Sequence, residues 1–202
     1  MNGSETDFFS NFYGVFVYFC KVKKNDVLCH GSLSQFTCLI PISINMKTYV
    51  ISDKAEMESV INDCNICFVG IADGEQQPYV IPMNFGYIDD EIILHSGPFG
   101  KHLDLIAKNN RVCVTFCSEG KLVYQHVDVA CSYRMDAKSV ICNGEVSFVD
   151  DLTEKETLLH RFMEKYTDRH FTYSQPALKN VKVWRVKVIE MTAKSFGQPH
   201  RK

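Results

Sequence analysis

The chain has 202 residues, a formal charge of −2 and a pI near 6.4, which excludes both a strongly basic nucleic-acid-binding surface and a polyanionic tail. This length suits one domain, or one domain with an extension, and an apolar content of 46% is enough for a sizeable core. Nine cysteines, an odd number scattered through apolar segments, predict buried thiols in a reducing cytoplasm and not a disulfide framework.

Residues 1–45 differ from the rest of the chain. Aromatic side chains crowd into the run Phe8–Cys20 without the period of a helix or a strand, and lysines follow this run, the reverse of a signal peptide. The run is also too short to span a bilayer comfortably. An interfacial anchor or an added strand stays open for this segment. We favour a third interpretation, in which Met46 is a natural start, residues 1–45 lie outside the native fold and residues 46–202 form the domain.

The first helix is predicted to begin after Asp53, because Asp53 and Glu56 form a D-x-x-E capping signature. An apolar stripe at helical spacing continues it: Met57, Val60, Ile61 and Cys64. Residues 65–72 are apolar at successive positions, which predicts a strand that is buried on both faces. Asp73-Gly74 then opens a turn.

A predicted hairpin and the helix after it organise the rest of the chain. Residues 79–87 alternate with the period of a strand, Asp89-Asp90 supplies a turn, and residues 91–95 form the returning strand. A segment rich in Gly and Pro interrupts this pattern, and a helix is predicted to begin near Lys101.

Two cationic residues occupy the first turn of that helix. Lys101 and His102 stand where the macrodipole and the unpaired N–H groups disfavour cations by about 0.3–1 kcal/mol. They are explained if an anion docks there, because the N–H groups and the ammonium then cooperate. The alternative is that both side chains bend into solvent. His95, at the end of the strand beside this loop, is a candidate for ligand contact, although a lone histidine is usually packed or solvated.

The remaining elements favour an antiparallel sheet. Residues 111–117, 138–149 and 181–191 are predicted strands, and Thr153 with Glu156 forms a second capping box that begins a helix. The total is six or seven strands and three helices, without an alternating βαβ rhythm. A mainly β fold, a closed or half-open antiparallel barrel, is therefore predicted.

The cysteines do not predict a metal site. Cys64-x-x-Cys67 is half a zinc or redox motif, but residues three apart in an extended segment point to opposite faces, and no second pair completes a tetrahedral set. Cys113 and Cys117 are about 13 Å apart at ~3.3 Å per residue, too far to chelate one ion, and are predicted core residues. No G-x-S-x-G, Walker or G-x-G-x-x-G motif is present, while a Cys/His nucleophile stays open.

Four motifs follow one another in order. They are PYVIPMNFGY (78–87), LHS (94–96), GK with Leu103 (100–103) and KSVICNG (138–144). Together they resemble the signature of the nitroimidazole-resistance (Nim) proteins, in the flavin-nucleotide-binding branch of the pyridoxamine 5′-phosphate oxidase-like split barrels. The resemblance covers Met46 to Lys194 and nothing upstream.

The resemblance implies a six-stranded antiparallel split β-barrel of the FMN-binding type, a homodimer with FMN or FAD at each subunit interface. The implied cofactor-binding residues are Pro82, Met83, Asn84, His95, Ser96, Gly100, Lys101 and Ser139. In this assignment Lys101 reaches the flavin phosphate, and His95 and Ser96 lie beside the phosphate or the ring. The backbone of residues 82–84 follows the isoalloxazine edge, and Ser139 matches a later serine whose role is less defined.

The implied function is a flavin-dependent oxidoreductase. It takes electrons from NAD(P)H or another donor and passes them to a small-molecule acceptor, such as a 5-nitroimidazole-type nitroaromatic, and His95 donates a proton. Gly100-Lys101 stands where the pyridoxamine phosphate oxidases carry Arg-Lys, and their C-terminal R-x-H motif has no clear counterpart, so oxidation of pyridoxamine phosphate is not expected. Two alternatives stay open: a haem-binding split barrel with His95 as axial ligand, and a flavin-binding module without turnover.

Overall fold

The structure is a computed structural model that describes residues 48–74 and 77–198. The predicted extension 1–45 and the proposed start at Met46 lie outside the described residues. Among the helices of the described part, none has the length and apolar character needed to cross a membrane.

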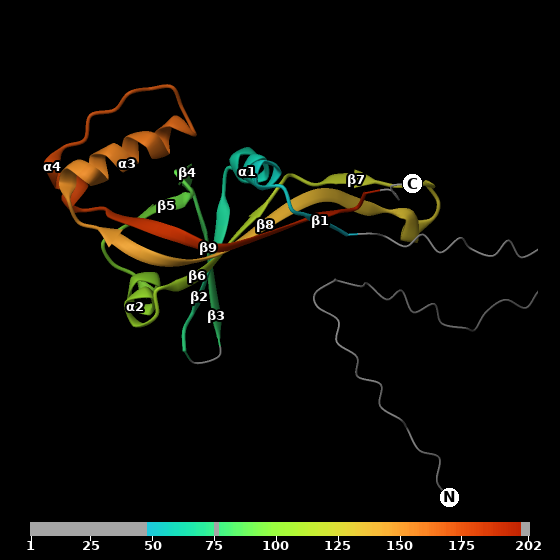
Figure 1. Cartoon of the computed structure of the whole chain (residues 1–202), viewed down its shortest axis with the longest axis horizontal. Coiled ribbons are helices and arrows are strands. Elements are labelled where there is room, and N and C mark those ends of the chain that lie inside the picture. Colours follow the sequence, from blue (N-terminus) through green and yellow to red (C-terminus); the bar gives the residue numbers. More distant parts are fainter. Residues whose placement is uncertain (1–47, 75–76, 199–202) are drawn as a thin grey trace, which may run out of the picture. The chain divides into compact units, whose positions relative to one another are not determined.

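One antiparallel sheet with four α-helices around it makes up the described part of the chain (Figure 1). The strands are β1 (Tyr49–Ile51), β2 (Cys67–Ala72), β3 (Pro78–Met83), β4 (Gly86–Ile88), β5 (Glu91–Ser96), β6 (Arg111–Cys117), β7 (Lys121–Val123), β8 (Arg134–Val149) and β9 (Lys182–Phe196). The helices are α1 (Lys54–Asp63), α2 (Lys101–Lys108), α3 (Leu152–Glu164) and α4 (Gln175–Lys179), with a 3-10 turn η1 at Ala130–Ser132.

The sheet is a barrel split along one seam. The strand order is β3-β2-β6-β8-β9-β5-β4, with β1 paired to β9 and β7 to β8. The two ends of this path, β3 and β4, are consecutive in sequence and are joined by Asn84 and Phe85 alone. Two residues span at most about 11 Å from Met83 to Gly86. The sheet must therefore curl until its edges meet at this corner, although β3 and β4 do not pair, and the predicted split-barrel fold is confirmed.

The break between β3 and β4 corrects the prediction of one strand over residues 79–87. The Tyr166 hydroxyl accepts a hydrogen bond from the Phe85 N–H at 2.9 Å, and it lies 2.9 Å from the Phe85 carbonyl and 3.1 Å from the Asn65 carbonyl. The Tyr166 side chain follows α3 and is 81 residues away in the sequence. It thus provides hydrogen-bond partners for the backbone where the strand stops. Alternation in sequence cannot show this, because the contact is long-range.

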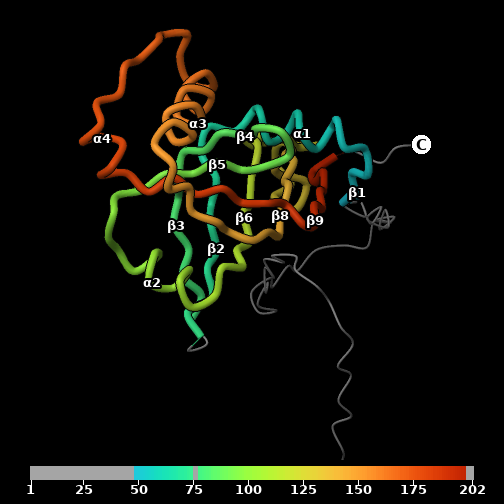
Figure 2. Tube along the Cα trace, turned by 60° about the vertical axis from the view of Figure 1, so that its left-hand side comes forward, coloured from blue at the N-terminus to red at the C-terminus, as the bar shows by residue number. Residues whose placement is uncertain are grey.

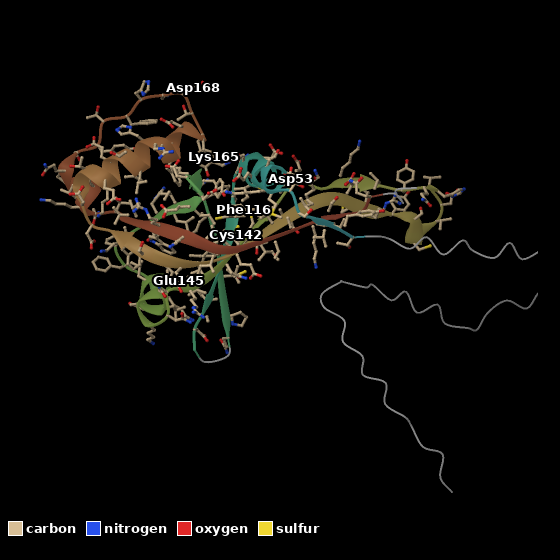
Figure 3. All side chains as sticks on the ribbon, viewed as in Figure 1. Asp53, Phe116, Cys142, Glu145, Lys165 and Asp168 are labelled. Carbon is tan, nitrogen blue, oxygen red and sulfur yellow. The ribbon has the colours of Figure 1, made fainter. Side chains whose placement is uncertain are left out.

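Two hydrophobic clusters stabilise the fold. The larger one fills the barrel and includes Phe116 and Cys142, both fully buried in the middle of the sheet (Figure 3). The smaller one lies under α3 and α4 and includes Ile93 and Phe162. Figure 2 shows α3 beside β4 and β5, and α2 apart from it near β3. The helix α2 therefore stands alone at its corner of the barrel.

Several local predictions are confirmed and several are wrong. Asp53 caps α1 as expected, and Asp89 and Asp90 form the β4–β5 turn with φ values of 50° and 66°. However, α3 is capped by Asp151, whose side chain accepts from the Glu154 N–H at 2.8 Å, and not by Thr153. Within residues 48–74 and 77–198 the sheet has nine strands instead of six or seven, since β1, β4 and β7 are short pieces of three residues each.

The strand β2 is buried on one face only, which corrects the prediction for residues 65–72. Its inner residues are buried, but Phe68 is 47% exposed. Cys113 and Cys117 lie on the same outer side of the sheet, so they are not core residues. We call this surface the outer face and define it by the side chains of β3, β2, β6 and β8 that point away from the barrel interior: Val80, Pro82, Phe68, Thr115 and Ile141.

Candidate functional site

The corner between β5 and α2 has the features of an anion site. Gly100 is the N-cap of α2 and offers no side chain, and its φ of 144° is one that L side chains rarely adopt. The N–H groups of Leu103 and Asp104 donate to the Gly100 carbonyl at 2.9 and 3.4 Å. The N–H groups of Lys101 and His102 have no hydrogen-bond partner within the described residues. Two donors at a helix start are thus left for a ligand.

The Lys101 side chain adds a cation to these donors. It is exposed, and its Nζ lies 5.2 Å from the centroid of the Tyr79 ring on β3. This cation–π contact holds α2 against the edge strand while the ammonium still reaches solvent. The short segment 100–102 therefore carries an exposed ammonium and two free N–H groups, the kinds of donor that a phosphate binds.

Ser96 fixes the loop that leads into this corner. Its Oγ accepts a hydrogen bond from the indole Nε1 of Trp184 at 3.2 Å and donates one to the Gly97 carbonyl at 2.9 Å. Trp184 is fully buried in β9, so the loop is tied to the barrel core. The Ser96 hydroxyl proton is already used, and a bound phosphate would find only the accepting side of this oxygen unless the hydroxyl rotates.

His95 lies on the opposite side of β5 from Ser96, as neighbouring residues of a strand do. Its ring meets the Phe162 ring of α3 edge-on at 4.9 Å between centroids. Part of the imidazole stays exposed, yet the atoms crowded around it remove enough water to lower its pKa below the ordinary 6.5. Within one protomer, His95 and Ser96 do not face a common ligand.

The other predicted residues are spread over three surfaces. Pro82 is exposed on the outer face opposite Phe68, whereas Met83 packs against the barrel core. The Asn84 amide donates to the Asn65 carbonyl at 3.3 Å and so supports the strand break. Ser139 lies on β8, next to Cys117 and Lys194 in the pairing of the strands. One protomer therefore brings Ser96, Gly100 and Lys101 together, and it does not bring Pro82, Ser139 or His95 to them.

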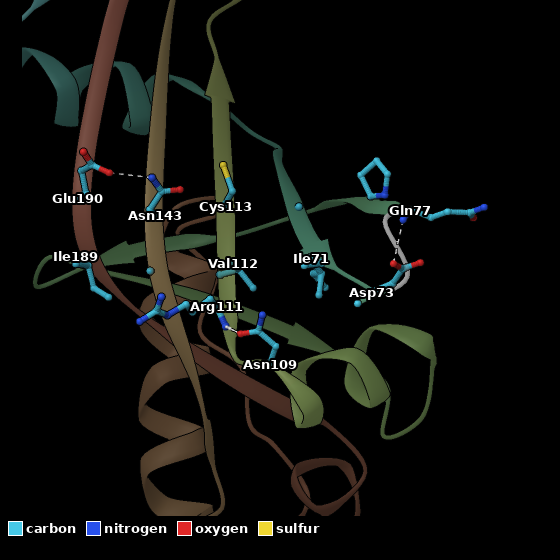
Figure 4. A pocket seen from close by; sticks show the side chains of 15 residues that line it. Ile71, Asp73, Gln77, Asn109, Arg111, Val112, Cys113, Asn143, Ile189 and Glu190 are labelled. Atoms are coloured by element: carbon cyan, nitrogen blue, oxygen red, sulfur yellow. Dashed lines mark hydrogen bonds between the residues drawn. The ribbon is translucent and has the colours of Figure 1, made fainter.

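A groove of about 830 Å³ lies on the outer side of the sheet (Figure 4). None of the eight predicted site residues lines it; its walls come from the β2–β3 turn, the start of β6 and the middle of β8 and β9. Two hydrogen bonds join polar groups on its rim: Asn143 donates to Glu190 at 3.0 Å and Asp73 accepts from the Gln77 N–H at 3.1 Å. Two strand glycines, Gly70 and Gly144, contribute to the hollow. Glycine inside a strand is the sequence signal that points to such a surface.

No metal centre is found among the described residues, in which no three His, Cys, Asp or Glu side chains come together. Cys64 and Cys67 are both buried, and burial raises the pKa of Cys67 to about 12. The Cys64 thiol donates to the Val60 carbonyl at 3.2 Å. These two cysteines pack in the core as thiols at the end of α1.

Comparison with known families agrees with this architecture. The sequence profile of the family described as pyridoxamine 5′-phosphate oxidase matches residues 53–195, most of the chain. The chain belongs to the pyridoxamine 5′-phosphate oxidase family. No curated protein matches it at a significant level.

Comparison with solved structures shows which proteins of that family the chain resembles. A candidate 5-nitroimidazole antibiotic resistance protein of Bacteroides thetaiotaomicron is 51% identical, with a TM-score of 0.69 over 75% of this chain and 89% of that one. This confirms the resemblance to the nitroimidazole-resistance proteins.

Two more distant structures share the fold alone. The flavocytochrome Anf3 of Azotobacter vinelandii is 18% identical, with a TM-score of 0.65 over 76% of this chain and 72% of that one. An FAD- and haem-binding protein of Mycobacterium smegmatis is 14% identical, with a TM-score of 0.64 over 76% of each chain.

Proposed function

We propose that this chain is a flavin-binding oxidoreductase that holds the phosphate of FMN or FAD at the start of α2. The observation that carries the proposal is the pair of unpartnered N–H groups beside the exposed Lys101 ammonium at an N-cap without a side chain. Helix starts of this kind bind phosphate groups, because the N–H donors and the macrodipole both favour a negative charge. The residues present therefore fit the phosphate end of a flavin nucleotide.

Each residue of the corner has a task in this proposal. Lys101 neutralises the phosphate, and the unpaired N–H groups of Lys101 and His102 donate to it. Ser96 keeps the loop in place through Trp184. When bound, the flavin supplies the exchange of electrons between a donor such as NAD(P)H and an oxidised acceptor. The protein itself then needs no nucleophile, in agreement with the absence of a recognised acyl-transfer motif in the sequence.

The ring of the cofactor is proposed to lie between two copies of the chain. Pro82 and Ser139 are on the outer face, away from the Lys101 corner, so a site that uses all three groups has to combine residues of two protomers. The outer face suits such contact, because Phe68, Val80 and Ile141 are 47%, 56% and 39% exposed there. An apolar surface of this kind is typical of a subunit interface. We therefore propose that the chain forms a homodimer. We also propose that it is cytoplasmic, because the six described cysteines are all free thiols.

The proposed acceptor is a small nitroaromatic compound of the 5-nitroimidazole type. The support for it is the similarity to the Bacteroides thetaiotaomicron protein. His95 is the proposed proton donor to the acceptor. Its lowered pKa leaves the ring neutral at pH 7, so we expect donation to become more effective as the pH falls towards that pKa.

The test compares FMN with riboflavin, which lacks the phosphate. We expect Lys101→Ala to weaken FMN binding about 10- to 100-fold, the value of a charge-assisted contact, and to leave riboflavin binding unchanged. Lys108→Ala, an exposed lysine at the other end of α2, is the matched control. Equal affinity of the wild type and Lys101→Ala for FMN would refute the proposed site. In the same series, His95→Ala should keep FMN but slow acceptor reduction.

A haem-binding protein is the second candidate, because two structures with this fold are named for haem or cytochrome content. His95, partly exposed at the end of β5, is then the axial ligand. The visible spectrum of the purified protein separates flavin from haem. A yellow protein that is inert towards NAD(P)H and nitroaromatics would instead indicate a flavin-binding module without turnover.

A further inference from the structure

The His102 ring is partly buried between the helix start and the barrel core. It stacks on Trp184, with 5.3 Å between centroids and 28° between planes. On another side it touches Gly100, where an added Cβ would lie 2.6 Å from the His102 Cε1. Its Nε2 is buried and forms no hydrogen bond within the described residues. A polar atom in that situation costs free energy, so the neutral ring is held here by packing alone.

We propose that His102 is a positioning residue of the anion corner that changes partner on protonation: the neutral ring rests on Trp184 and Gly100, and the imidazolium turns to the docked anion beside Lys101. This inference rests on the proposed function, because it needs a phosphate at the start of α2. It adds a second cation to the corner, the His102 imidazolium, which forms only when the anion is bound or when the pH is low.

The charges around the ring give this change its direction. Burial lowers the pKa of His102, and Asp104 on the same helix raises it. The positive end of the macrodipole also opposes a proton on the ring. A phosphate at the helix start reverses this balance, since it favours the imidazolium.

Within the part of the chain that the structure describes, Asp104 is the one charged side chain that shifts the pKa of His102. From β9 the His102 ring meets the Trp184 indole, and β5 reaches the indole through the Ser96 hydroxyl. The strand β2, which packs on α2, has Cys67 as its titratable residue, and burial raises the pKa of this thiol to about 12, so it stays neutral. Lys182 lies over Phe148 and pairs with Asp150 at 3.6 Å. The proton on His102 and the anion are therefore coupled mainly to each other: anion binding takes up a proton, and anion affinity rises as the pH falls.

The coupling can be followed without the flavin, because Trp184 is the single tryptophan of the chain. The emission of the full-length, cofactor-free protein is measured against pH, with and without inorganic phosphate. We expect a transition below pH 6.5, the ordinary value from which burial lowers the pKa of His102. Phosphate should shift its midpoint to higher pH, about one unit for each tenfold difference in phosphate affinity between the two protonation states.

Variants at two histidines identify the residue whose protonation causes the transition. His102→Phe keeps an aromatic ring on Trp184 and cannot titrate, so the transition should be lost. His160→Phe is the matched control, because His160 packs on Tyr173 beside α3 and should leave the transition intact. His102→Gln, checked by circular dichroism, serves if the Phe variant does not fold.

The outcomes separate this inference from the proposed function. A transition that survives in both His102 variants, or a midpoint that phosphate does not move, overturns the role of His102. Lys101-dependent binding of FMN would then still support the flavin site. A phosphate-dependent midpoint in a protein that binds no FMN would support the role of His102 at an anion site and reject the flavin.

Discussion

The two faces of the central sheet carry similar side chains but differ in how far these side chains are buried. On the inner face Val69, Val114 and Cys142 are completely buried. On the outer face of the same strands Phe68 and Ile141 are 47% and 39% exposed. The inner face is closed by the curled sheet and by α1, whereas nothing in the described part of the chain covers the outer one. The inner face therefore stabilises the fold, and the exposed outer face is the surface that we propose for association.

The α2 corner belongs to neither face. Its first turn is polar and stands apart from α3 and α4 (Figure 1), whereas Leu105 and Ile106 anchor the rest of α2 in the barrel core and Lys101 and His102 contact Tyr79 and Trp184. In the proposed function, stability and binding depend on different side chains, so a substitution of an outer-face or first-turn residue should leave the core nearly unchanged. The predictions below test that separation, beginning with the largest expected effect.

Phe116→Ala tests the inner face. The side chain is fully buried and meets the Phe85 ring edge-on at 4.7 Å, so its loss should reduce the free energy of unfolding by about 3–5 kcal/mol. Urea denaturation measures this value. Phe99→Ala, at a side chain that is 86% exposed, is the control and should change it by no more than about 0.5 kcal/mol. Equal effects of the two substitutions would contradict the assigned core.

Phe68→Asp tests the outer face. A carboxylate at the centre of an apolar interface should weaken dimerisation about 30-fold or more, as expected for a central interface residue, while the monomer stays folded. Sedimentation velocity gives the association state, and circular dichroism gives the fold. Phe171→Asp, on the loop between α3 and α4, should leave association unchanged. A wild type that is monomeric at all concentrations would remove the proposed interface.

The smallest expected effect is a dependence of stability on pH. The pKa values of His95 and His102 are both lowered in the folded protein, so the unfolded chain takes up these protons first as the pH falls. The free energy of unfolding should therefore decline from about pH 7 and level off below the folded-state pKa values. His95→Gln should flatten this decline, and the exposed His170→Gln should not. A decline of unchanged slope in His95→Gln would assign it to other groups.

The features that the sequence by itself predicted correctly are those that depend on local interactions. The Asp53 cap, the Asp89-Asp90 turn and the start of α2 near Lys101 each depend on interactions within a few residues, and all three are confirmed. The ordered motifs also identified the family and the split barrel. The eight cofactor-binding residues came from that resemblance, and they remain a proposal.

Only the tertiary structure decided which apolar surfaces are covered and where strands stop. Residues 79–87 alternate throughout, yet the strand breaks at Asn84 because Tyr166 binds the backbone there. Cys113 looks like a core residue in the sequence, but it lies on the outer face, because the barrel encloses the other face of β6. The stacking of His102 on Trp184 joins residues 82 positions apart. Such contacts depend on how distant segments pack, and no local pattern in the chain encodes them.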